Sequence, residues 1–482
     1  MIRAVALLAL PFVAGACSAV RPVKVTAPEA PASFLSNLDA ADAEARRARD
    51  EKPVERATEA EVWWTAFADP ALDGVIQEAL RNNYFIRDVR TLIYENLLDP
   101  TIPWNWLSPL QIGIPAGTPA GVQRVNVAVA GSNPSKAEYS SANIGLTASY
   151  QIDLWGNLGA QRRVARDFAE QQRQSTELAS QNIAEQVAQL WFDILVEREL
   201  KELAEREVKY NQDLFNLVKA RFDQHLVTRL AVLQQEQQLL ATQAQVPLIV
   251  ARIAILNSQL TGLLGRTPNP RDDLVPSERR LPDLPPAPAL GTPKDLLQST
   301  PEMRFARLRV TEIEHRVNQN LSSWLPTIEV LGSAGVVHFF DETFTESFAG
   351  VRMSWPIFDG GRRIIQGKQL DLTLKRRKWQ YELALKTAVG RVQDALLQER
   401  NQAESLQNLR AQLDLGRRLL AEARKIFEQG SSDYLPVLTA LANLAALERD
   451  ALRAQRLLLA YRVQLYRALG GIWSYDVTKI QQ

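Results

Sequence analysis

The sequence predicts a mixed α/β membrane protein in which a β-hairpin and a long α-helical hairpin occur twice. Three observations predict this fold class. Glycine and apolar positions recur at a constant offset of 205 residues. Each copy contains segments in which apolar and polar residues alternate, as expected of strands with one apolar face. Each pair of such segments is followed by a long stretch with helical periodicity.

Composition excludes several classes of protein. The 482 residues include 56 Lys and Arg against 55 Asp and Glu, a net charge of +1 without a basic block, which argues against nucleic acid as a partner. The chain has one Cys, and its three His (His225, His315, His338) are far apart, so neither a metal site nor a cofactor is indicated. After the N-terminal segment we find no stretch of the roughly 18 apolar residues that a membrane helix needs, so we expect any crossing to use strands.

The N-terminus predicts export and a lipid anchor. Residues 1–16 combine Arg3, an apolar run and small residues, which is the pattern of a signal peptide. Cys17 follows directly and resembles the lipidated first residue of a bacterial lipoprotein. The alternative is an ordinary secretory signal with an incidental Cys. Residues 17–60 are rich in Pro, Ala and charge, and we interpret them as a tether.

An internal duplication organises the rest of the chain. The aligned pairs include Gly145/Gly350, Gly156/Gly361, Phe222/Phe427, Val232/Val437 and Gly265/Gly470. Upstream, Leu80 lies opposite Leu297 at an offset of 217, so the copies differ in length near the Pro-rich stretch 100–119. We therefore divide the chain into a first repeat at 61–270, a Pro-rich linker at 271–286, a second repeat at 287–475 and a tail at 476–482.

The strand pairs are expected at about 122–130 and 142–153 in the first repeat, and at 327–337 and 348–358 in the second. Their length and their single apolar face fit transmembrane β-strands. A soluble β-hairpin packed on helices is the alternative. We expect Pro356, which cannot donate a ladder hydrogen bond, at the end where sheet gives way to helix.

The long helices are expected at about 156–224 and 228–264, and at 362–429 and 433–469. A helix of about 66 residues is roughly 100 Å long. Gly430 suits the end of its helix because glycine adopts positive φ at little cost, whereas its counterpart His225 is less suited.

Four strands cannot close a barrel, since the smallest need about eight. The chain must therefore oligomerise. Two copies would give a barrel filled by side chains, and three would give a wider lumen. The polar strand faces favour the version that holds water.

Three motifs resemble the outer membrane factors, the TolC-like channels, and in particular the lipoproteins of the NodT type. They are VWWTAFADPAL at 62–72, YQIDLWG at 150–156 and WPIFDGG at 355–361. The resemblance implies a homotrimer with a 12-stranded outer-membrane β-barrel continued by a periplasmic α-helical tunnel. It also implies docking to a periplasmic adaptor protein and an inner-membrane pump of the RND type, in a Gram-negative bacterium. We expect the three motifs to build structure rather than to perform chemistry.

The helix tips are the expected functional region. The resemblance implies acidic residues at the narrowest ring, but the matching positions here are Ala231, Pro436 and Thr439. Candidate constriction residues are Arg229, Gln234, Asp433 and Thr439. Candidate adaptor-docking residues are Phe222, Leu230, Val232, Phe427, Gly430, Tyr434 and Leu435. Packing within the bundle is the alternative role for this apolar set.

The function that follows is a passive outer-membrane exit duct for small molecules in a tripartite efflux system. One alternative is the exit duct of a type I protein secretion system. Another is a periplasmic structural or adaptor protein without a pore, although such a spacer does not need two strand pairs. An enzyme is disfavoured because no nucleophile–base pair or phosphate-binding loop is evident.

Overall fold

The computed structural model describes residues 23–31, 33–34, 62–97, 109–113, 121–127, 135–288, 290–339, 342–429 and 434–471. These residues belong to two compact units. A sheet unit draws on Leu92–Gln172 and Phe305–Tyr381, and a helical unit draws on Ala27–Thr91, Arg173–Arg304 and Glu382–Gln482. Cys17 lies outside the described residues, so the predicted lipidation site has no structural account.

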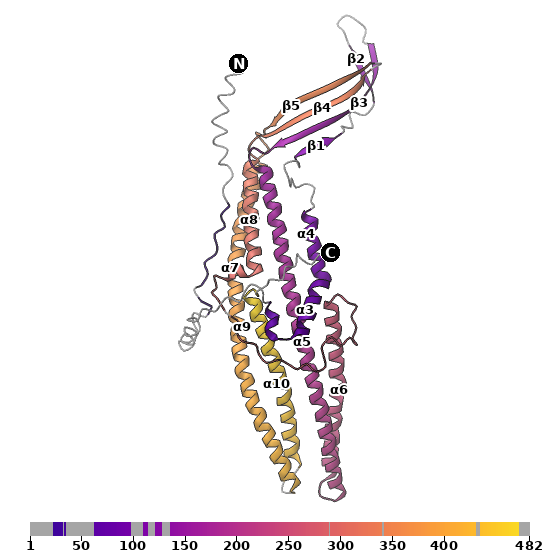
Figure 1. Cartoon of the computed structure of the whole chain (residues 1–482), viewed down its shortest axis with the longest axis vertical. Helices are drawn as coiled ribbons and strands as arrows, with labels where there is room; N and C mark the ends of the chain where they lie inside the picture. The colour runs from indigo at the N-terminus through magenta and orange to yellow at the C-terminus, as the bar shows by residue number, and fades with distance from the viewer. Residues whose placement is uncertain are drawn as a thin grey trace. The chain divides into compact units, whose positions relative to one another are not determined.

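The sheet unit contains an antiparallel sheet in the order β1-β3-β4-β5, with β2 also paired to β3 (Figure 1). Its strands are β1 (Leu110–Gly113), β2 (Gly121–Val127), β3 (Ser135–Ile152), β4 (Thr327–Phe339) and β5 (Glu342–Ser354). Both β1 and β2 pair with the edge of β3 that faces away from β4. The sheet is therefore four strand positions wide. Within the described chain, no strand pairs with the outer edge of β5 or with the outer edges of β1 and β2.

Two of the predicted strands had wrong boundaries. The strand expected at 122–130 is β2, for which residues 128–130 lie outside the described residues, and β1 precedes it on the same edge of β3. The strand expected at 142–153 begins at Ser135, and the strand expected at 348–358 is β5, shifted to Glu342–Ser354. Backbone hydrogen bonds form a ladder regardless of side-chain polarity, so strands extend into segments whose polar composition predicted loops. Proline does interrupt pairing, and β5 ends before Pro356.

The predicted apolar side chains do share one face of the sheet. The register places Tyr150 opposite Val330, and Val330 opposite Val351. Val351 is 70% exposed and Met353, on the same face, is 65% exposed. The other face carries the Glu329–Arg352 ion pair, in which Arg352 Nε donates to Glu329 Oε2 over 3.0 Å. An apolar face this exposed disagrees with a soluble hairpin packed on helices.

Where strand gives way to helix, each repeat has a capped corner. The Asp153 carboxylate accepts hydrogen bonds from Leu158 N and Gly159 N at the start of α5 (Asn157–Asp223). The Asp359 carboxylate accepts from Gly361 N and Arg363 N at the start of α9 (Arg362–Glu428). Negative charge at a helix N-terminus is favourable. The aspartates of two recognised motifs therefore serve as helix caps, as expected of structural motifs.

The indoles of the same motifs close these corners. Trp155 Nε1 donates to Pro326 O over 2.5 Å, and Trp355 Nε1 donates to Trp324 O over 3.1 Å. Each bond ties a corner to the segment between α8 (Pro301–Ser322) and β4. Both repeats thus use a tryptophan to stabilise the corner between strand and helix.

In the helical unit, α5 pairs with α6 (Arg229–Leu263) and α9 pairs with α10 (Leu435–Ala468) as two antiparallel hairpins (Figure 1). Each of the four helices starts and ends within two residues of the predicted position. At 67 residues, α5 and α9 are each roughly 100 Å long. Shorter helices complete the two units: α3 (Pro70–Asn82), α4 (Tyr84–Leu97) and α7 (Leu296–Ser299), with a 3₁₀ turn at Trp63–Phe67.

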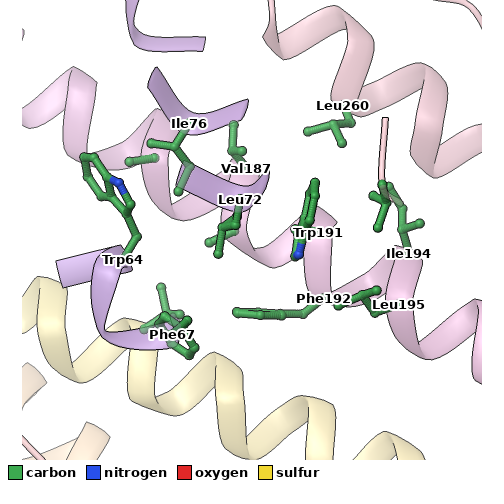
Figure 2. Packing of buried hydrophobic residues seen from close by; sticks show 14 of the residues in the cluster. Trp64, Phe67, Leu72, Ile76, Val187, Trp191, Phe192, Ile194, Leu195 and Leu260 are labelled. Carbon is green, nitrogen blue, oxygen red and sulfur yellow. The ribbon is translucent and has the colours of Figure 1, made fainter. Parts of the chain in front are cut away.

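The core of the helical unit forms where the first motif meets the middle of α5 (Figure 2). Trp64 and Phe67 from the 3₁₀ turn pack with Trp191 and Phe192, and all four side chains are buried. The indole N–H groups are satisfied, because Trp64 Nε1 donates to Asp73 Oδ1 over 2.7 Å and Trp191 Nε1 donates to Asp69 Oδ2 over 3.1 Å. The Trp-Trp motif is therefore a core element.

The Pro-rich linker is bound to both hairpins. Leu281 N donates to Glu199 on α5, and the Arg462 guanidinium on α10 donates to Pro285 O. Arg462 also pairs with Glu399 on α9 through bonds of 2.7 and 2.6 Å. The buried Arg462 thus joins the linker to α9 and α10, and Leu281 joins it to α5.

One helix departs from the expectation that no mature segment is apolar enough to cross a membrane. Among the described residues, α6 alone has the length and composition for a membrane span, yet only 11% of its apolar window is buried. Its buried side includes Gln235, Thr242 and Asn257, whereas Leu240 and Leu248 are exposed. Much of the apolar surface of α6 therefore faces away from the helical unit. Such a surface suits contact with a protein partner as well as with a bilayer.

The duplication extends to the ends of the hairpins. Gly265 follows α6 at φ 73° and Gly470 follows α10 at φ 93°. A Cβ on Gly265 would lie 2.4 Å from Asn82 O, and a Cβ on Gly470 would lie 2.9 Å from Ser299 O. Asn82 and Ser299 are themselves 217 positions apart, which is the upstream offset of the repeat.

We expect Gly265→Ala to lower stability by at least about 2–3 kcal/mol, because it combines left-handed backbone strain with a clash against backbone. Gly360→Ala is the matched control: its φ is 69° but nothing lies within 4 Å, so only the strain of about 1 kcal/mol applies. Thermal or denaturant unfolding of the purified proteins measures both. Equal losses would contradict the close-packing argument.

Candidate functional site at the helix tips

The candidate site comprises the turn between α5 and α6 and the turn between α9 and α10, both within the helical unit. The first turn is fully described. In the second, residues 430–433 lie outside the described residues, so the structure does not place Gly430 or Asp433. The site is therefore built from the first turn, from Phe427 on α9 and from the start of α10.

The first turn ends α5 in a left-handed residue. His225 has φ 58°, His225 N donates to Phe222 O over 2.9 Å, and Leu226 N donates to Arg221 O over 2.9 Å. This pair of bonds is the Schellman motif, which normally uses glycine. His225 thus occupies the glycine position in spite of its unfavourable side chain. Thr228 then caps α6 by accepting from Ala231 N.

A small apolar cluster joins the two tips. Phe427 and Tyr434 are buried and pack edge to face with ring centroids 5.9 Å apart. They meet Leu214 and Val218 from α5 and Val437 from α10, with Val232 half-buried beside them. The adaptor-docking candidates Phe427 and Tyr434 are therefore buried within the chain. Both belong to packing between hairpins, the alternative raised for this apolar set.

A buried polar link accompanies the cluster. The Tyr434 hydroxyl donates to Gln235 Oε1 on α6, and Gln235 Nε2 donates to Asn211 O on α5 over 2.9 Å. Burial raises the pKa of Tyr434 above its usual range, so its hydroxyl stays a donor at physiological pH. Breaking such a bond on one side leaves a buried acceptor unpaired, which costs about 1–3 kcal/mol.

Arg221 forms the second link between the hairpins. Its Nη1 donates to Phe427 O over 2.9 Å and its Nη2 donates to Glu428 O over 3.0 Å, while its guanidinium lies 4.2 Å from the centre of the Phe427 ring. A cation on the last carbonyls of α9 compensates the negative end of the helix dipole. We did not predict Arg221, Gln235 or Asn211 from the sequence. Only their tertiary contacts distinguish them from the many similar residues of these helices.

The remaining docking candidates are on the outside of the tips. Leu230 is 63% exposed, Leu435 is 61% exposed and Phe222 is 36% exposed. Leu226 and Leu233 are exposed beside them and were not among the candidates. Both hairpins therefore present large apolar side chains to solvent at one end of the helical unit.

The constriction candidates are polar and exposed in the lone chain. Arg229, Gln234 and Thr439 are all exposed, and Thr439 Oγ1 donates to Leu435 O of its own helix over 2.9 Å. Ala231 is half-buried against the apolar cluster. Among the described residues, no group of three or more His, Cys, Asp or Glu is arranged to hold a metal ion.

Comparison with known proteins agrees with this architecture. The profile of the family described as Outer membrane efflux protein matches residues 117–266 and 292–471. The pyoverdine export outer membrane protein OpmQ of Pseudomonas putida is 25% identical over 421 residues, 86% of this chain and 88% of its own. The toluene efflux pump outer membrane protein TtgC of Pseudomonas putida is 25% identical over 488 residues, 97% of this chain and 95% of its own.

A solved structure shows the same fold. The CmeC outer membrane channel of Campylobacter jejuni superimposes with a TM-score of 0.78 at 17% identity, covering 96% of this chain and 97% of that one. The duplicated hairpins, the small sheet and the matched residues lead to one assignment: the chain belongs to the outer membrane efflux protein family.

Proposed function

We propose that this protein is the outer-membrane exit duct of a tripartite efflux system and conducts small molecules passively. The observation that carries the proposal is the sheet, which has an exposed apolar face and two edges that no other described strand pairs with. A bilayer accepts an apolar face, but it does not accept unpaired backbone edges. The sheet therefore needs further copies of the chain on both sides.

A homotrimer satisfies this requirement. With four strand positions per chain, three copies form a closed barrel of 12 strands, which is wide enough for a water-filled lumen. The same three-fold arrangement would bring six helical hairpins together as a periplasmic tunnel, and the exposed apolar side chains of α6 would then face a neighbouring copy. An outer-membrane channel of this kind agrees with the family assignment.

The partners follow from the position of the tips. Phe222, Leu230 and Leu435 supply exposed apolar surface for a periplasmic adaptor protein, beyond which an inner-membrane pump of the RND type would deliver the cargo. The relatives OpmQ and TtgC are named for export of pyoverdine and efflux of toluene, which favours small molecules over the protein cargo of a secretion duct. The family and the exposed sheet also disfavour the pore-free adaptor alternative.

We further propose that Cys17 is lipidated and anchors the N-terminus to the outer membrane. The motivation is the signal-like sequence that ends just before this Cys. Cys17→Ser should abolish incorporation of labelled fatty acid, with the barrel still able to reach the membrane. Unchanged labelling would refute the anchor while leaving the channel proposal standing.

The absence of acids at Ala231, Pro436 and Thr439 makes a prediction about conduction. Like charges gathered near a pore axis repel strongly and bind cations, so a tip without them should close through packing and hydrogen bonds. Conductance in planar bilayers should then depend weakly on divalent cations, and weakly on pH between about 4 and 7. Introducing an acid with Thr439→Asp should create divalent block, because three copies turn one carboxylate into a ring.

Thr439→Asn is the matched control for that experiment, since it has nearly the shape of Asp without its charge. It should leave the conductance insensitive to divalent ions. Strong block of the unmodified channel by millimolar divalent cations would show that another acid, such as Asp433, already forms the ring. Absence of any pore activity would contradict the duct itself.

A further inference from the structure

The sheet unit contains an ionisable pair that none of the preceding roles uses. Asp167 on α5 and His315 on α8 approach each other with 3.5 Å between Asp167 Oδ2 and His315 Nε2. Their side chains are only 17% and 13% exposed. Asp167 Oδ2 and His315 Nδ1 are both buried, and neither has a hydrogen-bond partner among the residues that the structure describes. Buried polar atoms of this kind call for an explanation because most are paired.

The charges around the pair are fixed by other contacts. Glu312, one turn before His315 on α8, accepts from Gln171 Nε2 over 2.9 Å and from Arg316 Nε over 2.8 Å, so both of its oxygens are engaged. Arg163 lies one turn before Asp167 on α5 and acts on both members of the pair. Lys378 of α9, which also packs against α8, pairs with Glu314 over 3.7 Å.

These surroundings act on the two groups in opposite directions. Burial, and then the negative charge of Glu312, raise the pKa of Asp167 to about 6, although Arg163 lowers it. Burial and then Arg163 lower the pKa of His315 below its usual value. The ionised carboxylate of Asp167 is therefore poorly stabilised near neutral pH. With Asp167 ionised and His315 neutral, the pair carries a net charge of −1 and can accept one proton.

We propose that Asp167 and His315 form a shared proton-binding site that draws α5 and α8 together when the surroundings become acidic. The pair takes up one proton from solvent, and its net charge changes from −1 to zero. Repulsion between Asp167 and Glu312 across the two helices then disappears. With the proton bound, one hydrogen lies between Asp167 Oδ2 and His315 Nε2 and the other imidazole nitrogen keeps its own, so the two side chains are joined without a net negative charge beside Glu312.

The direction of the stability effect follows from the linkage between proton binding and folding. Asp167 binds a proton more tightly in the folded chain than in the unfolded chain, so its contribution is greatest in acid and is lost as the pH rises through about 6. His315 acts in the opposite sense, because its folded form resists a proton that the unfolded imidazole accepts, so it offsets part of the Asp167 contribution in acid. α5 belongs to the first repeat and α8 to the second. The site would therefore regulate how tightly the two repeats pack against each other next to the sheet.

Asp167→Asn in the full-length protein tests the proposal, because Asn is neutral at every pH. The variant should melt at a higher temperature than the unmodified protein at about pH 8, and this difference should fall by at least half at about pH 5. Asp213→Asn, which removes an exposed acid elsewhere on α5, is the control and should show a difference that does not vary with pH in this way. A difference for Asp167→Asn that is constant across the range overturns the proposal.

Hydrogen exchange of the unmodified protein keeps the test independent of how the variant folds. After correction for intrinsic exchange rates, amides of α8 around His315 should be several-fold better protected at about pH 5.5 than at about pH 7.5, relative to amides of α10. Equal protection of α8 at the two pH values would show that no proton is bound there. Neither measurement depends on conduction, so the outcome is separate from the channel proposal.

Discussion

Two edges of the sheet find no partner strand among the described residues, and this shapes every other part of the molecule. β5 presents 13 residues of backbone along one side, and β1 and β2 together present the other. Each unpaired N–H or C=O group in an apolar environment costs several kcal/mol, so this sheet is stable in a bilayer only when another chain completes it. The exposed apolar face, the aromatic corners and the apolar surface of α6 can all be understood as parts of a chain that finishes folding by assembly.

Because of the internal duplication, two similar halves of one chain contribute to the sheet and to the helical hairpins. Each repeat supplies strand positions to the sheet and one long helical hairpin, and each uses an aspartate cap and a tryptophan at the corner between them. The copies differ at their tips, where His225 occupies a position that glycine normally fills. Arg221 and Tyr434 then join the two hairpins at their tips, where a few polar bonds surround a small apolar cluster.

Much of the fold could be predicted from the sequence because the relevant signals are periodic. The offset of 205 residues, the alternation around Tyr150 and Val351, and the long helical runs all reflect constraints that repeat along the chain. The boundaries of β3 and β5 could not be predicted, since backbone pairing continues through polar residues that carry no periodic signal. For the same reason, the sequence did not indicate that two strands, β1 and β2, share the first position of the sheet.

The candidate site was less predictable. Exposed Leu230 and buried Phe427 are both apolar residues near a turn, and only the packing of one hairpin on the other separates their roles. Arg221 is one of many arginines on long helices, and its place on the carbonyls of α9 is a tertiary fact. The Asp167–His315 pair likewise joins residues that are 148 positions apart in the chain, with no motif to connect them.

The open sheet is completed by copies of the same chain. The most direct test is the mass of the purified protein in mild detergent, measured by native mass spectrometry or by light scattering corrected for bound detergent. We expect a single species of three chains. A stable, folded monomer or dimer would contradict it, because its sheet would then keep edges that only a further strand can satisfy.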